Sequence, residues 1–154
     1  MSDDAYEPEW EIAWHGVQPC LEDDEVQRIA GAALAFGGRA GAALSVVFVD
    51  DPTLAEMHAE YLDDPSPTDV MSFDLGDEGA GPIGELFVSV DCARRLAAER
   101  GVRFERELAL YLVHGSLHLC GFDDHEPEER AEMRRAEAQV MGDLGFEADL
   151  GEHE

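Results

Sequence analysis

The residues best suited to chemistry are three histidines in one short stretch, His114, His118 and His125. His114 and His118 are four residues apart in an apolar segment with helical periodicity, so both imidazoles project from one helix face on successive turns. Two ring nitrogens placed in this way can bind the same metal ion. Gly121 is typical of a residue that ends a helix, and the chain then turns back and delivers His125 as a third donor. Three protein ligands with one open position are the arrangement of a catalytic zinc site, whereas a structural zinc site is closed by a fourth ligand.

The alternative is that these histidines are core residues, because a histidine on an apolar helix is more often hydrogen-bonded than metal-bound. A buried neutral imidazole, however, needs partners for both ring nitrogens. Three histidines within twelve residues would need six such partners in a small volume. One metal ion satisfies three of these nitrogens at once, so the spacing favours a metal site.

The residue after the first histidine indicates which chemistry such a metal would serve. A zincin protease has Glu at this position as the general base, and this chain has Gly115. Asp123, Asp124 or Glu107 could act as a base instead, but the usual peptidase arrangement is missing. A metal with three histidine ligands can also polarise a phosphoryl oxygen or lower the pKa of a water molecule towards about 7. Either effect suits the cleavage of a phosphodiester bond.

The elements that must position these residues follow from hydrophobic periodicity. The histidine helix, expected from about 103 to 120, is apolar nearly all round, so it should be central and buried. Strands are expected at 10–17, 44–49, 69–74 and 85–90. Helices are expected at 24–36 and 103–120, and from Asp51, Asp91 and Glu126 onwards. This order predicts one α+β domain with a small mixed four-stranded sheet, about five helices and a zincin-like histidine helix. The ends, 1–9 and 149–154, are expected to be loose.

The charge of the chain excludes one class of function. The 154 residues include 10 basic and 36 acidic ones, which gives a net charge of −26, and every basic residue is Arg. Such a surface repels polyanions, so non-specific binding of nucleic acid through a broad basic face is excluded. Eight of the ten arginines lie between positions 94 and 135. Those at 94–106 could contact a polyanion, or they could pair with glutamates on solvated helix faces.

Cysteine content and hydropathy indicate the compartment. The three cysteines, Cys20, Cys92 and Cys120, are odd in number and lack C-x-x-C spacing, which argues for reduced thiols and against a cysteine zinc site. No apolar run approaches the roughly 20 residues of a membrane span, and the acidic N-terminus is unlike a signal peptide. The expectation is a cytoplasmic protein with no membrane partner.

Two motifs resemble those of a known family. His114-Gly-Ser-Leu-His-Leu-Cys-Gly-Phe-Asp-Asp-His125 resembles the H-G-x-L-H-L-x-G-[YF]-D-H signature of the YbeY family, and Pro67-Thr-Asp-Val-Met-Ser-Phe73 is similar to its P-T-D-V-L-S-F segment. The resemblance implies one YbeY-like metal-dependent hydrolase domain over 1–154. It implies an endoribonuclease specific for single-stranded RNA that acts in rRNA processing, rRNA maturation and ribosome quality control, with the small ribosomal subunit as partner.

The same resemblance assigns the site. It implies one metal ion per chain, bound by His114, His118 and His125, and the histidine ligands indicate that this ion is Zn²⁺. His114, His118, Asp69 and Ser72 are the implied catalytic residues, with Asp69 and Ser72 lining the groove opposite the histidine helix.

The chain departs from the family pattern at two places. It has an additional Asp before the last histidine, so Asp124 could compete with His125 as the third ligand. Leu62 and Asp64 stand where the family often has cations, so a phosphate contact by such a cation does not carry over. Two alternatives therefore stay open: a non-catalytic, metal-stabilised factor associated with the ribosome, and a metallohydrolase with a substrate other than RNA.

Overall fold

The computed structural model describes residues 9–62, 70–76, 81–123 and 125–146, with 58–62 described by their backbone alone. The described strands are β1 (Glu11–Trp14), β2 (Leu44–Val49), β3 (Val70–Asp74) and β4 (Gly84–Ser89). The described helices are α1 (Asp23–Phe36), α2 (Asp51–Leu62), α3 (Val90–Arg100), α4 (Phe104–Leu119) and α5 (Pro127–Asp143). The predicted α+β class and element order are confirmed, and most bounds differ from the expected ones by one residue. The first strand is shorter than the expected 10–17.

The strands form one mixed sheet in the order β1-β2-β4-β3. β1 and β4 both run parallel to β2, and β3 pairs antiparallel with β4, where Ser72 lies opposite Leu86. The largely apolar sequence of β2 is explained by its interior position, since helices cover both faces of the sheet.

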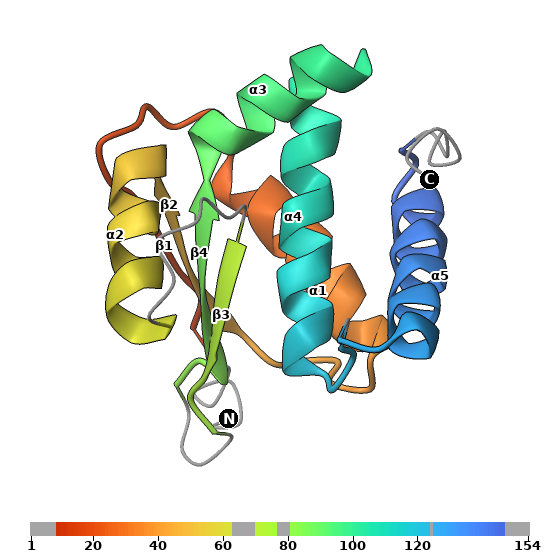
Figure 1. Cartoon of the computed structure of the whole chain (residues 1–154). Helices are drawn as coiled ribbons and strands as arrows, with labels where there is room; N and C mark the ends of the chain where they lie inside the picture. The colour runs from red at the N-terminus through yellow and green to blue at the C-terminus, as the bar shows by residue number, and fades with distance from the viewer. Residues whose placement is uncertain (1–8, 63–69, 77–80, 124, 147–154) are drawn as a thin grey trace.

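Helices on the two faces of the sheet create a three-layer arrangement, which Figure 1 shows with the sheet between α2 on one side and α1 and α4 on the other. A small apolar cluster that includes Val49, Leu54 and Met71 contains residues of β2, α2 and β3. The main core contains residues of β2, β4 and the other helices.

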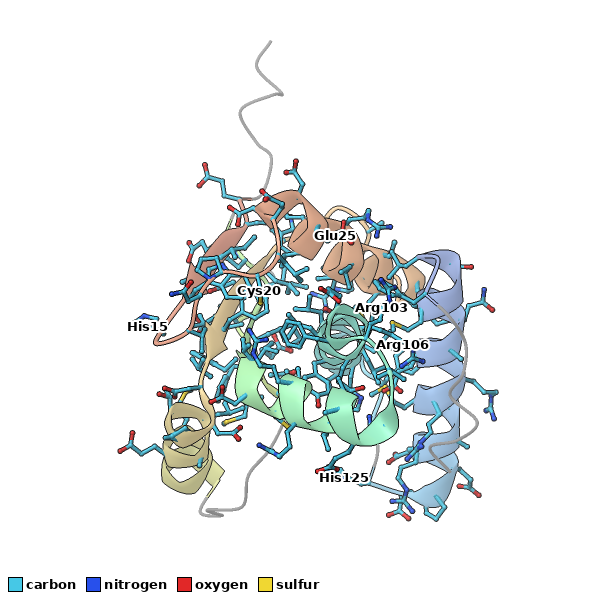
Figure 2. The ribbon with its side chains drawn as sticks, turned by 90° about the horizontal axis from the view of Figure 1, so that it is seen from above. His15, Cys20, Glu25, Arg103, Arg106 and His125 are labelled. Atoms are coloured by element: carbon cyan, nitrogen blue, oxygen red, sulfur yellow. The ribbon has the colours of Figure 1, made fainter. Side chains whose placement is uncertain are left out.

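Helix α4 lies at the centre of the larger helical layer. It contacts α1, α3 and α5 as well as β3 and β4, and Figure 2, seen nearly along its axis, shows it surrounded by these elements. Its apolar character on nearly every side therefore reflects burial by the rest of the chain. Among the described residues, no helix combines the length and the apolar character needed to cross a membrane.

The C-terminal end of α4 is held by the loop that follows α1. Arg39 donates from Nη1 to the carbonyl of Leu119 at 3.2 Å. Gly37 lies so close that a Cβ added to it would be 2.4 Å from Cβ of Cys120. Gly37 has φ −84°, which any residue adopts, so glycine is required here by the close approach of two chain segments.

We therefore expect Gly37→Ala to lower the free energy of unfolding by about 1–3 kcal/mol, because the new methyl group overlaps an atom attached directly to the backbone of α4. Gly142→Ala is the matched control, since nothing lies within 4 Å of a Cβ at that position. In the control the loss of backbone entropy on folding is reduced, so stability should rise by roughly 0.5–1 kcal/mol. Urea unfolding measures both changes, and a Gly37→Ala protein as stable as the parent would contradict the close approach.

Candidate metal centre

The structure brings two of the predicted ligands together. His114 and His118 project from successive turns of α4, with ring centroids 4.7 Å apart and ring planes inclined by 81°. Both side chains are partly exposed, although the residues between them are buried. The i,i+4 spacing thus places two imidazoles side by side at an accessible part of an otherwise enclosed helix.

A carboxylate that the sequence analysis missed contacts the first of these rings. Glu137 of α5 places Oε2 2.5 Å from Nδ1 of His114, and the side chains of His114 and Glu137 are only 23% and 14% exposed. The signal was present in the sequence, because Glu137 lies midway between Met133 and Met141 at i,i+4 spacing, where an amphipathic helix would have another apolar residue.

The third predicted ligand lies apart from this pair. The His125 side chain is 73% exposed, and its Nε2 lies 3.4 Å from Oδ1 of Asp123. Figure 2 shows His125 at the edge of the molecule in that view. Within the part of the chain that the structure describes, no three His, Cys, Asp or Glu side chains converge on a point that could hold a metal. Asp124, the possible competitor, lies outside the described residues, so the third ligand stays a prediction.

Ser72 links the sheet to α4 at Gly115, the residue that follows His114. Its Oγ donates a hydrogen bond to the carbonyl oxygen of Gly115 at 3.1 Å. A Cβ added to Gly115 would lie 3.1 Å from Leu86 Cδ2 and Val70 Cγ2, and 3.2 Å from Ser72 Oγ. The position at which a zincin has its catalytic Glu is therefore filled by the sheet. Asp69, the other predicted groove residue, lies outside the described residues.

Glu107 is a structural acid in this protein. Its side chain is 0% exposed and accepts a hydrogen bond from Arg100 Nη1 at 2.6 Å. Its other oxygen, Oε1, is buried without a hydrogen-bond partner in the described structure. A carboxylate enclosed in this way between α3 and α4 cannot reach a solvent-accessible substrate, so Glu107 is excluded as the alternative base.

The arginines at 94–106 are largely engaged by the protein itself. Arg95 pairs with Asp51 at 2.6 Å, and the Arg94 guanidinium lies 4.4 Å from the centroid of the Phe104 ring. Hydrogen bonds from Ser89 and Arg95 outweigh the desolvation of Asp51 and lower the pKa of its carboxyl. These contacts favour the interpretation that the cluster serves folding.

The remaining arginines of this cluster lie at the far end of α4 from the paired histidines. Arg106 is buried and Arg103 is exposed, and Figure 2 shows both at the near end of α4. His118 is in the last turn of the helix, about 22 Å along the axis from Arg103 at 1.5 Å per residue. Arg130 of α5 lies beside the third predicted ligand, since it donates from Nη1 to the carbonyl of His125 at 3.2 Å.

The donors at the paired position fit a borderline metal such as zinc, because imidazole nitrogen is a ligand that zinc prefers. A ligating histidine commonly has its second ring nitrogen bonded to a carboxylate, as His114 has with Glu137. Cys120 does not fit the donor set, since burial raises the pKa of its thiol and its Sγ points to the carbonyl of Leu34. A hollow of about 700 Å³ beside the start of α1 is lined by none of the predicted site residues.

The buried pair of Arg100 and Glu107 leads to a stability prediction. We expect Arg100→Leu to lower the free energy of unfolding by about 3 kcal/mol, because it leaves the buried Glu107 carboxylate unpaired. Adding Glu107→Leu should recover most of that loss, because neither charge then remains. Arg103→Leu, at an exposed arginine three residues away, is the control and should change stability by less than about 0.5 kcal/mol. Additive losses in the double variant, measured by urea unfolding, would show that the two side chains are not coupled.

Comparison with known proteins shows to which family the chain belongs. A family model described as Endoribonuclease YbeY matches residues 20–145. The Endoribonuclease YbeY of Rhodopirellula baltica is 39% identical over 158 residues, which cover 100% of this chain and 79% of that protein. The protein of the same name from Symbiobacterium thermophilum is 35% identical over 136 residues, 80% of this chain and 87% of its own.

A solved structure shows that the fold is shared. The solution structure of TM1509 from Thermotoga maritima aligns with a TM-score of 0.56 at 22% identity, over 88% of this chain and 91% of that one. The family model and the relatives together cover most of the sequence, including the histidine helix. The chain therefore belongs to the YbeY family of endoribonucleases.

Proposed function

We propose that this protein is a zinc-dependent endoribonuclease that cleaves single-stranded RNA. It would act on rRNA in the cytoplasm, in processing, maturation and quality control of the ribosome, with the small ribosomal subunit as its partner. Family membership supports an RNA substrate. The observation that carries the metal assignment is the pair of adjacent imidazoles on α4, one of them contacted by a carboxylate.

In this proposal His114, His118 and His125 hold one Zn²⁺. The metal, when bound, supplies Lewis acidity for a phosphoryl oxygen and lowers the pKa of a water molecule. His125 is exposed on the loop after α4, so core packing does not hold its ring away from the other two. Asp124, on the same loop, is the alternative oxygen donor.

The rest of the site shapes the approach of the RNA. Ser72 holds β3 against α4 at Gly115, directly beside the two histidines. That hydrogen bond helps to hold β3 against α4. The substrate would therefore bind beside a part of the sheet whose position relative to the histidine helix is constrained. Asp69, immediately before β3, is proposed as a further lining residue of the groove.

The charge of the protein limits how it holds RNA. With a net charge of −26 the surface repels a polyanion at long range. Arg95 and Arg100 are paired with Asp51 and Glu107, and such pairs reduce what these side chains offer to phosphates. Positive charge at the site would come from the metal and from Arg130 beside His125.

We expect purified protein to contain about one zinc ion per chain and His114→Ala to lose it. Cleavage of a single-stranded RNA oligonucleotide should fall more than about 100-fold in this variant, since loss of a residue that only supports a ligand already costs about 10–100-fold. His15→Ala, which removes an exposed histidine at β1, is the control and should retain both zinc and activity. Metal analysis and a gel-based cleavage assay measure the two quantities.

Related measurements on the same proteins distinguish the proposed function from its alternatives. Unchanged zinc in His114→Ala would remove the proposed site, and cleavage that persists after metal is stripped would remove the proposed mechanism. Co-sedimentation with small ribosomal subunits without any RNA cleavage would favour the non-catalytic factor. Hydrolysis of another substrate class by the zinc-loaded protein, without RNA cleavage, would favour a different hydrolase.

The acidic surface also predicts an unusual response to salt. For a basic nuclease, raising monovalent salt from about 50 to 200 mM weakens RNA binding by orders of magnitude. Here we expect kcat/KM for a short single-stranded RNA to stay constant or rise over that range, because salt screens the long-range repulsion. Steady-state kinetics at constant zinc measures it. A steep fall in kcat/KM with salt would show that several arginines contact phosphates.

A further inference from the structure

We propose that Glu137 is a positioning residue of the metal site: its carboxylate holds the His114 ring in the orientation and tautomer in which Nε2 coordinates the metal. This inference rests on the proposed function, since it assigns a role in the same site. It concerns a residue on α5, outside the two motifs in which the chain resembles its family.

The contact is direct and well enclosed. Oε2 of Glu137 lies 2.5 Å from Nδ1 of His114, in a hydrogen bond between helices α5 and α4. The two residues are 23 positions apart in the sequence. Figure 1 shows α5 beside α4, on the side of α4 away from the sheet. Only the docking of α5 onto α4 creates this contact.

The position of Glu137 on α5 argues against a role in solubility. Met133 and Met141, one turn before and one turn after it, are 1% and 0% exposed. Ala136 and Val140, which flank it on the same side, are buried as well. A carboxylate in such surroundings loses hydration, which is unfavourable unless a hydrogen-bonded partner replaces the water. His114 is that partner, so its hydrogen bond compensates for the hydration that the Glu137 carboxylate loses.

The helix that carries Glu137 is fixed at its start. Pro127 occupies the first turn, and the side chains of Glu126 and Glu129 form a reciprocal capping box. The cap defines where α5 begins, and the buried Met133 and Met141 place this face of the helix against the core. Glu137 is therefore presented at a fixed place and does not depend on a flexible loop.

A carboxylate on Nδ1 has a defined effect on an imidazole. It accepts the Nδ1–H hydrogen bond, so the lone pair of the neutral ring is on Nε2, and it limits rotation of the ring. Two other roles are possible for the same contact. Glu137 could itself be a metal ligand, completing a His-His-Glu set, or it could only stabilise the packing of α5 on α4. The three roles predict different results for the same substitutions.

The test uses zinc alone as the probe, added to metal-stripped full-length protein and measured by competition with a chromophoric chelator. The variants are Glu137→Gln and Glu137→Leu. Glu132→Gln is the matched control, with the same change of charge on an exposed position of the same helix. Thermal unfolding of each metal-free protein gives a separate measure of stability.

We expect both Glu137 variants to bind close to one zinc ion, with an affinity about 10–100-fold lower than that of the parent. The loss should be greater for Leu than for Gln, because Gln still offers an oxygen to Nδ1–H. Metal-free Glu137→Gln should be about as stable as the parent, since its amide oxygen still accepts a hydrogen bond from Nδ1–H of His114. A fall in zinc affinity without a fall in stability is the result that a packing role would not produce.

Each other outcome overturns the inference in a recognisable way. Loss of zinc stoichiometry in Glu137→Gln, as in His114→Ala, would make Glu137 a ligand. Unchanged zinc affinity with reduced stability would make it a packing residue, and the metal site itself would stand. An equal loss of zinc affinity in Glu132→Gln would show that the change in net charge alone weakens zinc binding. A parent protein that binds no zinc would overturn the proposed function, and this inference with it.

Discussion

Helix α4 is apolar on almost every side, and the rest of the structure depends on covering it. Eleven of its residues are buried, and it contacts the sheet and three other helices. A polar group on such a helix must be partnered or must reach the surface. Ser116 donates to the carbonyl of Leu112 within the helix, and Glu107 is paired with Arg100 across to α3. His114 and His118 reach solvent at a gap between the covering elements, which confines the chemistry of this helix to one place.

The sequence predicted those parts of the structure that depend on local periodicity. The histidine helix, the buried strand β2 and the order of the elements all follow from patterns of period two or 3.6, which neighbouring residues determine. The parts that it did not predict depend on how elements dock. Glu137 was overlooked because its partner is 23 residues away, and the only local sign was a charge in an apolar row. The arginines of 94–106 formed a cluster in the sequence, but docking turned Arg95 towards Asp51 and Arg100 towards Glu107.

The distribution of charge follows from the same packing. An excess of acidic residues raises the self-repulsion of the folded chain, and paired arginines inside the helical layer offset part of it locally. The pairs that matter are those with a buried member, such as Glu107, because a surface pair is worth little in water. Arginine suits these positions better than lysine, since its planar guanidinium keeps its charge when buried and can also lie against a ring, as Arg94 does against Phe104. Arg95 and Arg100 thus contribute to the packing of α3, and their pairing makes them less available to an RNA partner.

One residue connects the packing of α4 with the reaction class. In a helix with two histidines four residues apart, the position after the first histidine is rotated by about 100° from it. In this fold that direction is occupied by Val70, Leu86 and Ser72 of the sheet, which would lie 3.1–3.2 Å from a Cβ at this position and crowd any side chain there. Gly115 therefore lets α4 lie directly against β3, and its carbonyl accepts the Ser72 hydrogen bond. The same glycine removes the general base that a zincin peptidase requires. Because a side chain at this position would be crowded by the sheet, the packing of α4 on β3 disfavours the zincin arrangement with its glutamate, which agrees with membership of an endoribonuclease family.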